Sequence, residues 1–285
     1  FVIGDAGPTC YPTNNQYYLF AGLLNTPVCH YILQILNPTL NYSPGVLANL
    51  PVIIPQKINE VNQLVKECCQ IAKESWDVNE TSWEFNKSPL LNDELNFENS
   101  CNKFLLKISD SLRRLQICES EINKIFIDAY SLDSELDSSV SFSNLSIYQD
   151  EVDLKNLDLL NSTIDINNTS VNSDVIVQKF IMYIFGCIVG RYRLNDNGLN
   201  IAHQRPSADS FAAYDYNNCT INIDDDSIIP LMDTDSPFSD NIVSYFKFFL
   251  QVVWGEDKLT ENINFVNASL GMDVEKYLTE KLWDF

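Results

Sequence analysis

The chain has 285 residues, of which 45% are hydrophobic and 20% are charged, and its formal net charge is −21. At ~150 residues per domain, this length corresponds to about two domains. The apolar content excludes a globally disordered chain. The negative charge argues against a broad basic face for nucleic acid, because such a face must neutralise phosphates.

No targeting or membrane segment is predicted. The first residues, FVIGDAGPTCYPTNNQYY, contain neither a basic segment nor a long apolar run. They also lack an initiator methionine, so we expect a piece of a longer protein. The longest apolar stretch, FIMYIFGCIVG at 180–190, is too short to span a bilayer and predicts a buried helix. Without a membrane-spanning segment, no membrane partner is expected. The eight cysteines form no C-x-x-C pair, and without a secretory signal we expect them to be free thiols in a reducing cytoplasm.

The first 130 residues predict short helices followed by a helical hairpin. Pro27 suits the first turn of a second short helix, and Asn37 before Pro38 ends that helix. A Pro-Gly turn and a short strand at 52–54 are predicted next. From Lys57, apolar residues recur every three or four positions, and a second such helix is predicted from 99 to about 130. A Trp-containing loop joins the two helices, which implies an antiparallel hairpin.

The remainder predicts an acidic connection and a helical domain. Residues 131–175 are acidic and serine-rich, which predicts surface turns or a partly mobile connection. An apolar helix closing near Gly190 follows, then an irregular loop with one short strand, then helices ending at Gly255, at Gly271 and beyond the end of the chain.

The expected fold is therefore mainly α with a small β component: a long antiparallel helical hairpin plus a C-terminal helical domain. The expected domains are an N-terminal region at 1–56, a helical hairpin at 57–130, an acidic connection at 131–175 and a C-terminal helical domain at 176–285.

The loop that begins at Asn37 shares two of the four residues of a known catalytic motif. Adenine methyltransferases hold a flipped base with Asn/Asp-Pro-Pro-Tyr/Phe, whose aromatic ring stacks on the base. The segment Asn37-Pro38-Thr39-Leu40 lacks the second proline and the aromatic ring. No glycine-rich strand–turn–helix segment precedes it, VIGDAG at 2–7 being the nearest approach. We interpret the segment as a structural turn and assign no catalytic residue.

No metal site is predicted. His30 and His203 are the only histidines, and no ligand cluster surrounds either of them. Asp224, Asp225 and Asp226 could hold a hard cation, but three consecutive carboxylates are expected to point in different directions. A solvated acidic turn is the preferred interpretation.

Exposed cations and tryptophans are the candidates for DNA contact. Arginine is the usual side chain for phosphate and guanine contact. For Arg113 and Arg114, however, a solvated helix face is the preferred interpretation. Trp76 and Trp83 lie in one loop, where packing over the hairpin end is preferred to base stacking. The candidate DNA contacts are Arg191, Arg193, Arg205, Arg113, Arg114, Lys103 and Lys107.

Several segments together resemble a known family. LFAGLLNTPVCHYILQILNPTLNYSPGVLANLPV, IAKESWDVNETSWEFNKSPLL, FGCIVGRYRLNDNGLN and VVWGEDKLTENINFVNASLG are similar to the C-terminal region of the PglX adenine-specific DNA methyltransferases of BREX phage-defence systems. The resemblance covers most of residues 17–285 and is weakest at 131–175.

This resemblance implies a role in a larger enzyme. Such proteins methylate adenine at N6 within a short asymmetric site, using S-adenosylmethionine, and their catalytic motifs would lie upstream of Phe1. The resemblance therefore implies a non-catalytic part, without its own cofactor, that helps the whole protein to recognise or position double-stranded DNA. It also implies that residues 1–56 are the tail of a target-recognition domain and residues 57–130 a spacer hairpin, which the change of period at Lys57 supports.

Two alternatives remain open. The chain could be an acidic protein–protein interaction module that docks other defence-system subunits. The parent protein could also cleave DNA, although no Asp…Glu-x-Lys cluster stands out in the sequence.

Overall fold

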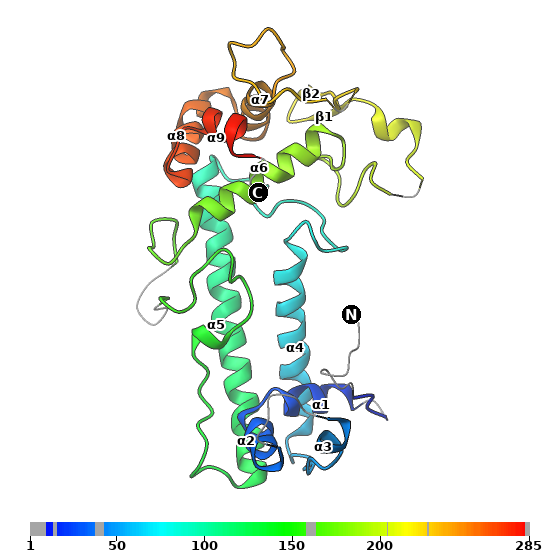
Figure 1. Ribbon diagram of the computed structural model, residues 1–285, viewed down its shortest axis with the longest axis vertical. Helices are drawn as coiled ribbons and strands as arrows, with labels where there is room; N and C mark the ends of the chain where they lie inside the picture. The colour runs from blue at the N-terminus through cyan, green and yellow to red at the C-terminus, as the bar shows by residue number, and fades with distance from the viewer. Residues whose placement is uncertain are drawn as a thin grey trace. The chain divides into compact units, whose positions relative to one another are not determined.

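The computed structural model describes residues 10–13, 16–37, 43–157, 164–203, 205–226 and 228–282 (Figure 1). Within these ranges the chain is mainly helical and forms one two-stranded antiparallel sheet, which confirms the expected fold class. The segments VIGDAG and Pro38-Thr39-Leu40 lie outside the described residues. The chain divides into two compact units, unit one comprising Phe1–Lys73 with Asp110–Ile147, and unit two comprising Glu74–Ser109 with Tyr148–Phe285. The four domains expected from the sequence stay a prediction.

Unit one contains three short helices and parts of two long ones. Its elements are α1 (Tyr17–Leu24), α2 (Pro27–Leu36), α3 (Pro44–Ala48), the first part of α4 (Ile58–Asp77) and the second part of α5 (Phe97–Tyr130). As predicted, Pro27 begins α2, and the Thr26 side chain accepts a hydrogen bond from the Cys29 N–H. Asn37 ends α2 with extended backbone, the conformation favoured before proline.

The core of unit one confirms the antiparallel hairpin. The apolar face of α4 packs against the apolar face of α5 within one buried cluster. Gly22 of α1 lies against Val65 of α4 and Phe126 of α5, while Glu67 of α4 pairs with Arg114 of α5. Lys57, directly before α4, interacts electrostatically with Asp128 near the end of α5. Contacts that advance from residue 57 to 67 therefore move back along α5 from residue 128 to 114, so the two helices run in opposite directions. The buried α4 and α5 side chains are Val61, Leu64, Val65, Cys118, Ile122, Ile125, Phe126 and Ile127.

The strand predicted at residues 52–54 is wrong. Among the described residues, strand pairing is confined to β1 with β2 and to a single bridge between Val152 and Val171. The 52–54 segment instead attaches to the end of α5. The Ile53 N–H donates to the Tyr130 hydroxyl at 3.0 Å, and that hydroxyl donates to the Pro51 carbonyl at 2.6 Å. A β-branched run forms a strand only where another strand offers its backbone.

The acidic connection is better packed than its composition predicts. Apart from the short 3-10 helix η1 (Phe142–Asn144), its described part consists of turns, coil and the bridge at Val152. Several of its apolar residues are nevertheless buried, among them Leu145 at 1% and Val152 at 0% exposure, while others such as Leu136 and Phe142 are half-buried. The expectation of surface turns is therefore wrong for these side chains. Sparse apolar residues anchor a segment whose polar majority faces solvent.

Unit two is built around an aromatic cluster. It contains the first part of α5, α6 (Ser173–Ile188), α7 (Ile242–Trp254), the 3-10 helix η3 (Glu256–Lys258), α8 (Leu259–Leu270) and α9 (Val274–Glu280). The Phe97 ring lies 4.8 Å from that of Phe180 and 4.9 Å from that of Trp254, between centroids. The Trp254 indole N–H donates to the Ser100 hydroxyl at 3.2 Å. The predicted buried helix at 180–190 is confirmed as the C-terminal half of α6.

A small hairpin follows α6. After the 3-10 helix η2 (Ala208–Phe211), strands β1 (Tyr214–Tyr216) and β2 (Cys219–Ile221) pair antiparallel, where the sequence predicts one strand. Asn217 and Asn218 join them with φ of 48° and 61°, as type I′ hairpin turns require.

The C-terminal helices end largely as predicted. Gly255 and Gly271 follow α7 and α8 with positive φ, whereas α9 stops at Glu280 instead of continuing. Across the described residues, no individual helix has both the length and the apolarity to cross a bilayer. Helices α1 and α2 reach that length and apolarity only together, and they meet at a 71° bend.

Candidate functional site

Unit two contains a pocket of about 450 Å³. Its walls come from the end of α4, the loop that follows α4, the middle of α6 and residues 150–151. This volume lies within the range of small-molecule sites, roughly 300–1,000 Å³. The lining is mainly apolar and includes Phe85, Leu90, Phe104, Ile176, Phe180 and Tyr183.

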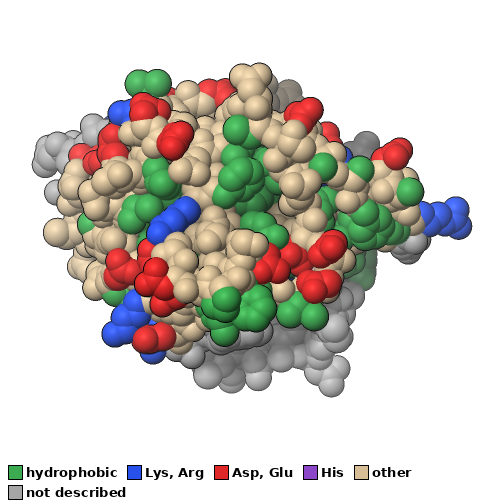
Figure 2. Space-filling view, turned by 90° about the horizontal axis from the view of Figure 1, so that it is seen from above, with side chains coloured by type: hydrophobic (Ala, Val, Ile, Leu, Met, Phe, Trp, Pro, Cys, Tyr) green, Lys and Arg blue, Asp and Glu red, His purple; other side chains and the backbone are tan. Residues whose placement is uncertain are grey.

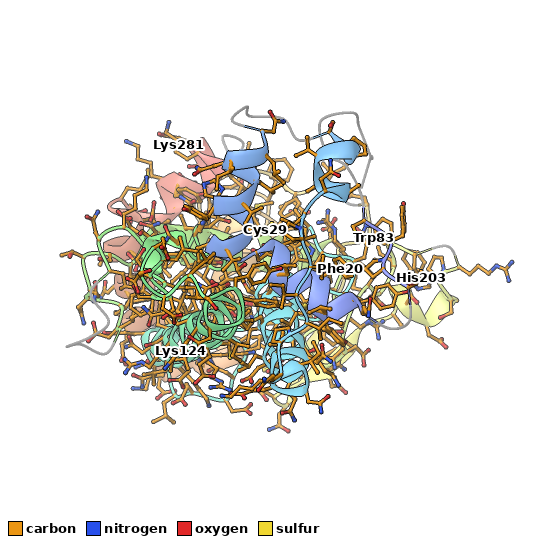
Figure 3. The ribbon with its side chains drawn as sticks, turned by 90° about the horizontal axis from the view of Figure 1, so that it is seen from below. Phe20, Cys29, Trp83, Lys124, His203 and Lys281 are labelled. Carbon is orange, nitrogen blue, oxygen red and sulfur yellow. The ribbon has the colours of Figure 1, made fainter. Side chains whose placement is uncertain are left out.

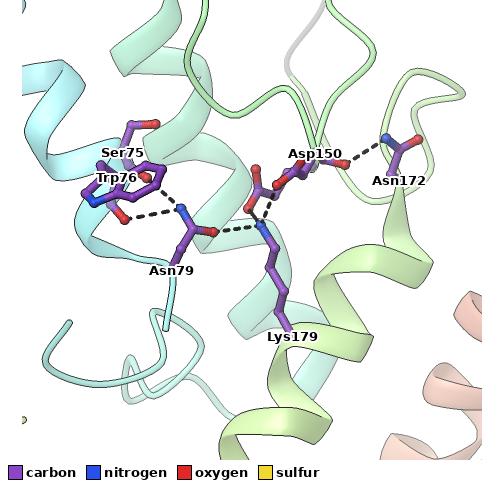
Figure 4. A network of polar contacts seen from close by, with 7 residues as sticks. Ser75, Trp76, Asn79, Asp150, Asn172 and Lys179 are labelled. Atoms are coloured by element: carbon purple, nitrogen blue, oxygen red, sulfur yellow. Dashed lines mark hydrogen bonds and ion pairs between the residues drawn. The ribbon is translucent and has the colours of Figure 1, made fainter. Parts of the chain in front are cut away.

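A lysine network fixes one wall of the pocket (Figure 4). Lys179 of α6 donates to Glu151 Oε1 at 2.6 Å, to Asn79 Oδ1 at 2.8 Å and to Asp150 Oδ2 at 3.3 Å. The Asn79 amide in turn donates to the carbonyls of Ser75 and Trp76, both at 3.2 Å. The ammonium donors are thereby occupied, so Lys179 holds the wall together and has little capacity left for a ligand.

A second charged pair on the lining is looser. Arg191 Nη1 lies 3.6 Å from Glu80 Oε2, and 45% of the Arg191 side chain is exposed. The guanidinium also lies 6.0 Å from the Tyr192 ring centroid. Burial raises the pKa of Glu80, while its hydrogen bond with Tyr192 and the Arg191 charge oppose that rise. The pair thus offers an accessible donor beside an acceptor.

The two tryptophans differ from the prediction and from each other, because Trp76 lies in the last turn of α4 and only Trp83 lies in the loop. The Trp83 side chain is fully exposed, so the expectation that it packs over the hairpin end is wrong (Figure 3). Trp76 is 59% exposed and lines the pocket. The Trp76 indole therefore lies where the pocket meets solvent, and the Trp83 indole is exposed on the loop that follows α4.

Three of the predicted DNA contacts are held by other parts of the protein. The Arg193 guanidinium donates to the carbonyls of Asp209 at 2.6 Å and Ala212 at 2.9 Å. Arg114 forms a bidentate salt bridge with Glu67, donating one hydrogen bond to each carboxylate oxygen. Lys103 pairs with a carboxylate, Glu94, at 3.0 Å and donates to the carbonyl of Asn92 at 2.9 Å. These geometries stabilise loops and helix faces.

The remaining predicted cations lie on separate elements. Lys107 and Arg113 are exposed on α5, and Arg205 is exposed in the loop before η2. Of the seven candidates, only Arg191 lines the pocket. On the face seen in Figure 2, basic, acidic and hydrophobic side chains are interspersed among the coloured residues and form no basic field.

The acidic triplet is closer together than expected. One carboxylate oxygen from each of Asp224, Asp225 and Asp226 lies within 4.8 Å of the others, so the expectation that they point apart is wrong. Two of these groups serve the fold, because Asp224 accepts from the Tyr245 hydroxyl at 3.1 Å and Asp226 accepts from the Ile228 N–H at 2.8 Å.

Sequence reasoning missed four charged pocket residues, Glu80, Asp150, Glu151 and Lys179. One signal was available, because Lys179 is the single basic residue of α6, an otherwise apolar helix. A lysine in a helix expected to be buried requires a carboxylate partner. Nothing local identifies Glu151 as that partner, since 28 positions separate the two residues.

Comparison with known proteins identifies relatives, although no family model matches the chain. It is 29% identical to the adenine-specific methyltransferase BrxX of Escherichia coli O9:H4 (strain HS) over 309 aligned positions, covering 99% of this chain and 24% of that protein. It is 26% identical to the adenine-specific methyltransferase PglX of Lacticaseibacillus casei (strain Zhang) over 279 positions, covering 95% of this chain and 21% of that protein. The chain spans about a quarter or less of these relatives. The resemblance seen in the sequence is thus confirmed, and the chain is homologous to the adenine-specific methyltransferases BrxX and PglX.

Proposed function

We propose that the chain is a non-catalytic part of a site-specific adenine-N6 DNA methyltransferase and contributes to DNA target recognition or positioning. The homology to BrxX and PglX over almost the whole chain carries this proposal. Because the match covers a quarter of BrxX or less, the chemistry belongs to the longer protein. That protein uses S-adenosylmethionine on double-stranded DNA in a BREX-type or related restriction–modification system.

A structural role for Asn37 supports the non-catalytic assignment. Asn37 ends α2, and its backbone N–H donates to the Leu33 carbonyl at 2.8 Å. A residue in this position terminates a helix. In this proposal residues 1–56 are the tail of a recognition domain, and residues 57–130 are a spacer.

Phosphate contacts are few and local in this proposal. The net charge of −21 repels DNA at long range. Among the described residues, Lys107 and Arg205 are exposed and their side chains form no ion pair. Such isolated cations position a protein on DNA without reading its sequence. The catalytic part of the longer protein then supplies most of the affinity.

The test compares methylation by the longer protein with and without this segment. N6-methyladenine is mapped across the host genome by single-molecule sequencing. Deletion of residues 1–285 is expected to abolish methylation or to relax its site preference. Equally selective and undiminished methylation after deletion contradicts the proposal.

A charge-reversal variant covers the case in which the deletion impairs folding. Lys107→Glu with Arg205→Glu is expected to reduce methylation several-fold, most strongly at high salt, because two phosphate contacts are lost. The matched control, Lys57→Glu with Lys276→Glu, reverses two exposed lysines that pair with neighbouring glutamates. Equal losses in both variants would assign the effect to net charge alone.

One observation favours a second candidate function, docking of other defence-system subunits. Residues 1–56 contain no lysine or arginine, yet Ile35 is 68% exposed and Ile54 is 57% exposed. Exposed apolar side chains in a segment without cations suit a protein partner better than DNA. Ile35→Asp with Ile54→Asp is then expected to abolish co-purification of those subunits while DNA methylation in vitro is retained.

A further inference from the structure

The pocket of unit two has no role in the proposed function, and its lining is specific enough to indicate a ligand class. Five charged side chains line it. Glu80, Asp150 and Glu151 carry one negative charge more than Lys179 and Arg191 neutralise. An isolated phosphate or another anion is therefore disfavoured. The mainly apolar lining selects a ligand that is largely uncharged.

The lysine network makes the wall rigid. Glu151 is buried, with 4% of its side chain exposed, and Lys179 holds it at 2.6 Å. The backbone of Asp150 is fixed as well, because the Asn172 amide donates to its carbonyl at 2.8 Å. The Asn79 amide fixes the backbone carbonyl of Trp76. A wall held in this way is pre-organised, which lowers the entropic cost of binding.

The open side of the pocket offers a stacking surface and a hydrogen-bonding edge. Trp76 lines the pocket and is 59% exposed, so part of its indole is accessible to a planar ring. The guanidinium of Arg191 keeps several N–H donors beyond its 3.6 Å contact with Glu80. The Glu80 carboxylate supplies an adjacent acceptor.

We infer that this pocket binds an unpaired nucleobase, stacked on Trp76 and hydrogen-bonded along its edge to Glu80 and Arg191. Nucleobases are planar, uncharged rings that present neighbouring donors and acceptors. Stacking on an aromatic side chain contributes ~1–3 kcal/mol per base in proteins that bind single strands. A free nucleotide and an unpaired DNA strand both offer this chemistry.

The test uses the 285-residue chain carrying Trp83→Phe, so that Trp76 becomes the main exposed tryptophan among the described residues. Its fluorescence is titrated with each nucleoside monophosphate, with a short single-stranded oligonucleotide, with the corresponding duplex, and with ribose 5-phosphate, which lacks a base. Saturable quenching by base-containing ligands and none by ribose 5-phosphate is expected. The absence of saturable quenching by every base-containing ligand overturns the inference.

Variants assign the binding to this pocket. Glu80→Ala and Arg191→Ala are each expected to weaken binding about tenfold, the effect of losing one good contact to a base edge. Trp76→Ala, followed by calorimetry, is expected to weaken it at least as much. Lys276→Ala, an exposed lysine outside the lining, is the matched control. Circular dichroism melting curves verify that each variant folds.

Comparing the affinities of the ligands distinguishes a free nucleotide from an unpaired DNA strand as the source of the base. Binding of monophosphates that matches the single strand identifies a free nucleotide, whereas much tighter binding of the single strand identifies an unpaired DNA strand. Binding that remains unchanged in Glu80→Ala, Arg191→Ala and Trp76→Ala overturns the inference. The proposed function survives that outcome, because it depends on homology and on methylation by the longer protein.

Discussion

Lys179 donates a hydrogen bond to Glu151 across 2.6 Å, and only 4% of the Glu151 side chain is exposed. A carboxylate buried this deeply is tolerated as an ion only while its cation is present. We therefore expect Lys179→Met to reduce the free energy of unfolding by about 2–4 kcal/mol. Urea unfolding followed by tryptophan fluorescence and circular dichroism measures the loss.

The control for this prediction is an exposed lysine. Lys276 lies 3.9 Å from Glu280, and about 60% of both side chains is exposed. Lys276→Met is expected to cost at most about 0.5 kcal/mol. The double variant Lys179→Met with Glu151→Gln should recover part of the loss, because no buried charge is then left unpaired. Similar losses for the two lysine variants would show that the network is not stabilising.

A second ion pair makes the stability of unit one depend on pH. Arg114 donates to both carboxylate oxygens of Glu67, at 2.5 and 2.7 Å. Hydrogen bonding to Arg114 lowers the pKa of Glu67 below its usual 4.5, outweighing the opposing effect of partial burial. Since the folded pKa is the lower one, the stabilisation is present above about pH 4.5 and is lost as the pH falls through the folded value.

Arg114→Ala tests this pH dependence. Both side chains are 40% or more exposed, so solvent screens the pair and the expected loss at pH 7 is only about 0.5–1 kcal/mol. The difference between wild type and variant should shrink below pH 4.5, as measured by urea unfolding at pH 7 and pH 3.5. A difference that persists unchanged at pH 3.5 would assign the effect to packing of the arginine stem.

Local signals in the sequence were sufficient for much of the fold. Pro27 starts α2, and Gly255 and Gly271 follow the ends of α7 and α8. Each of these boundaries depends on backbone conformations that one residue type favours. The period of apolar residues likewise determined the hairpin, because a stripe along a helix must be buried somewhere.

Contacts between distant residues had no local signal. Asn262 accepts a hydrogen bond from the Phe97 N–H at 2.9 Å, which caps the start of α5 from 165 positions away. The Lys179–Glu151 wall of the pocket is non-local in the same way. Arg193 was a candidate DNA contact because arginine suits phosphate, yet its guanidinium donates to backbone carbonyls in η2 and directly after it. The residue type determines which groups a side chain can bind, but which groups lie beside it depends on the fold.

Helix α1 lies so close to the hairpin at Gly22 that adding one methyl group there is expected to lower the stability of the fold. A Cβ on Gly22 would lie 2.9 Å from Val65 Cγ2, and 3.4 Å from Phe126 Cε2. Valine in a helix has little rotamer freedom to yield. We expect Gly22→Ala to destabilise by about 1 kcal/mol or more, since overpacking costs roughly 1–3 kcal/mol and exceeds the gain in helix propensity.

Gly45→Ala is the matched control. This glycine is also helical, in α3, but its nearest neighbour to an added Cβ is Ser43 Oγ at 3.9 Å. Alanine there should be neutral or stabilising by up to about 1 kcal/mol, because only helix propensity changes. The stabilities of the two variants are compared by thermal unfolding. A Gly22→Ala variant as stable as Gly45→Ala would show that α1 can move away from Val65.

Two adjacent cysteines should differ sharply in reactivity. Cys69 is exposed on α4, whereas burial raises the pKa of Cys68 to about 12. Because the thiolate is the reactive form, alkylation at pH 8 followed by mass spectrometry is expected to modify Cys69 rapidly and Cys68 slowly. Cys101, fully buried with its pKa also raised by burial, should react only after unfolding in urea. Equal labelling of Cys68 and Cys69 in the folded protein would mean that this face of α4 opens readily, and the packing of α4 in unit one would then have to be revised.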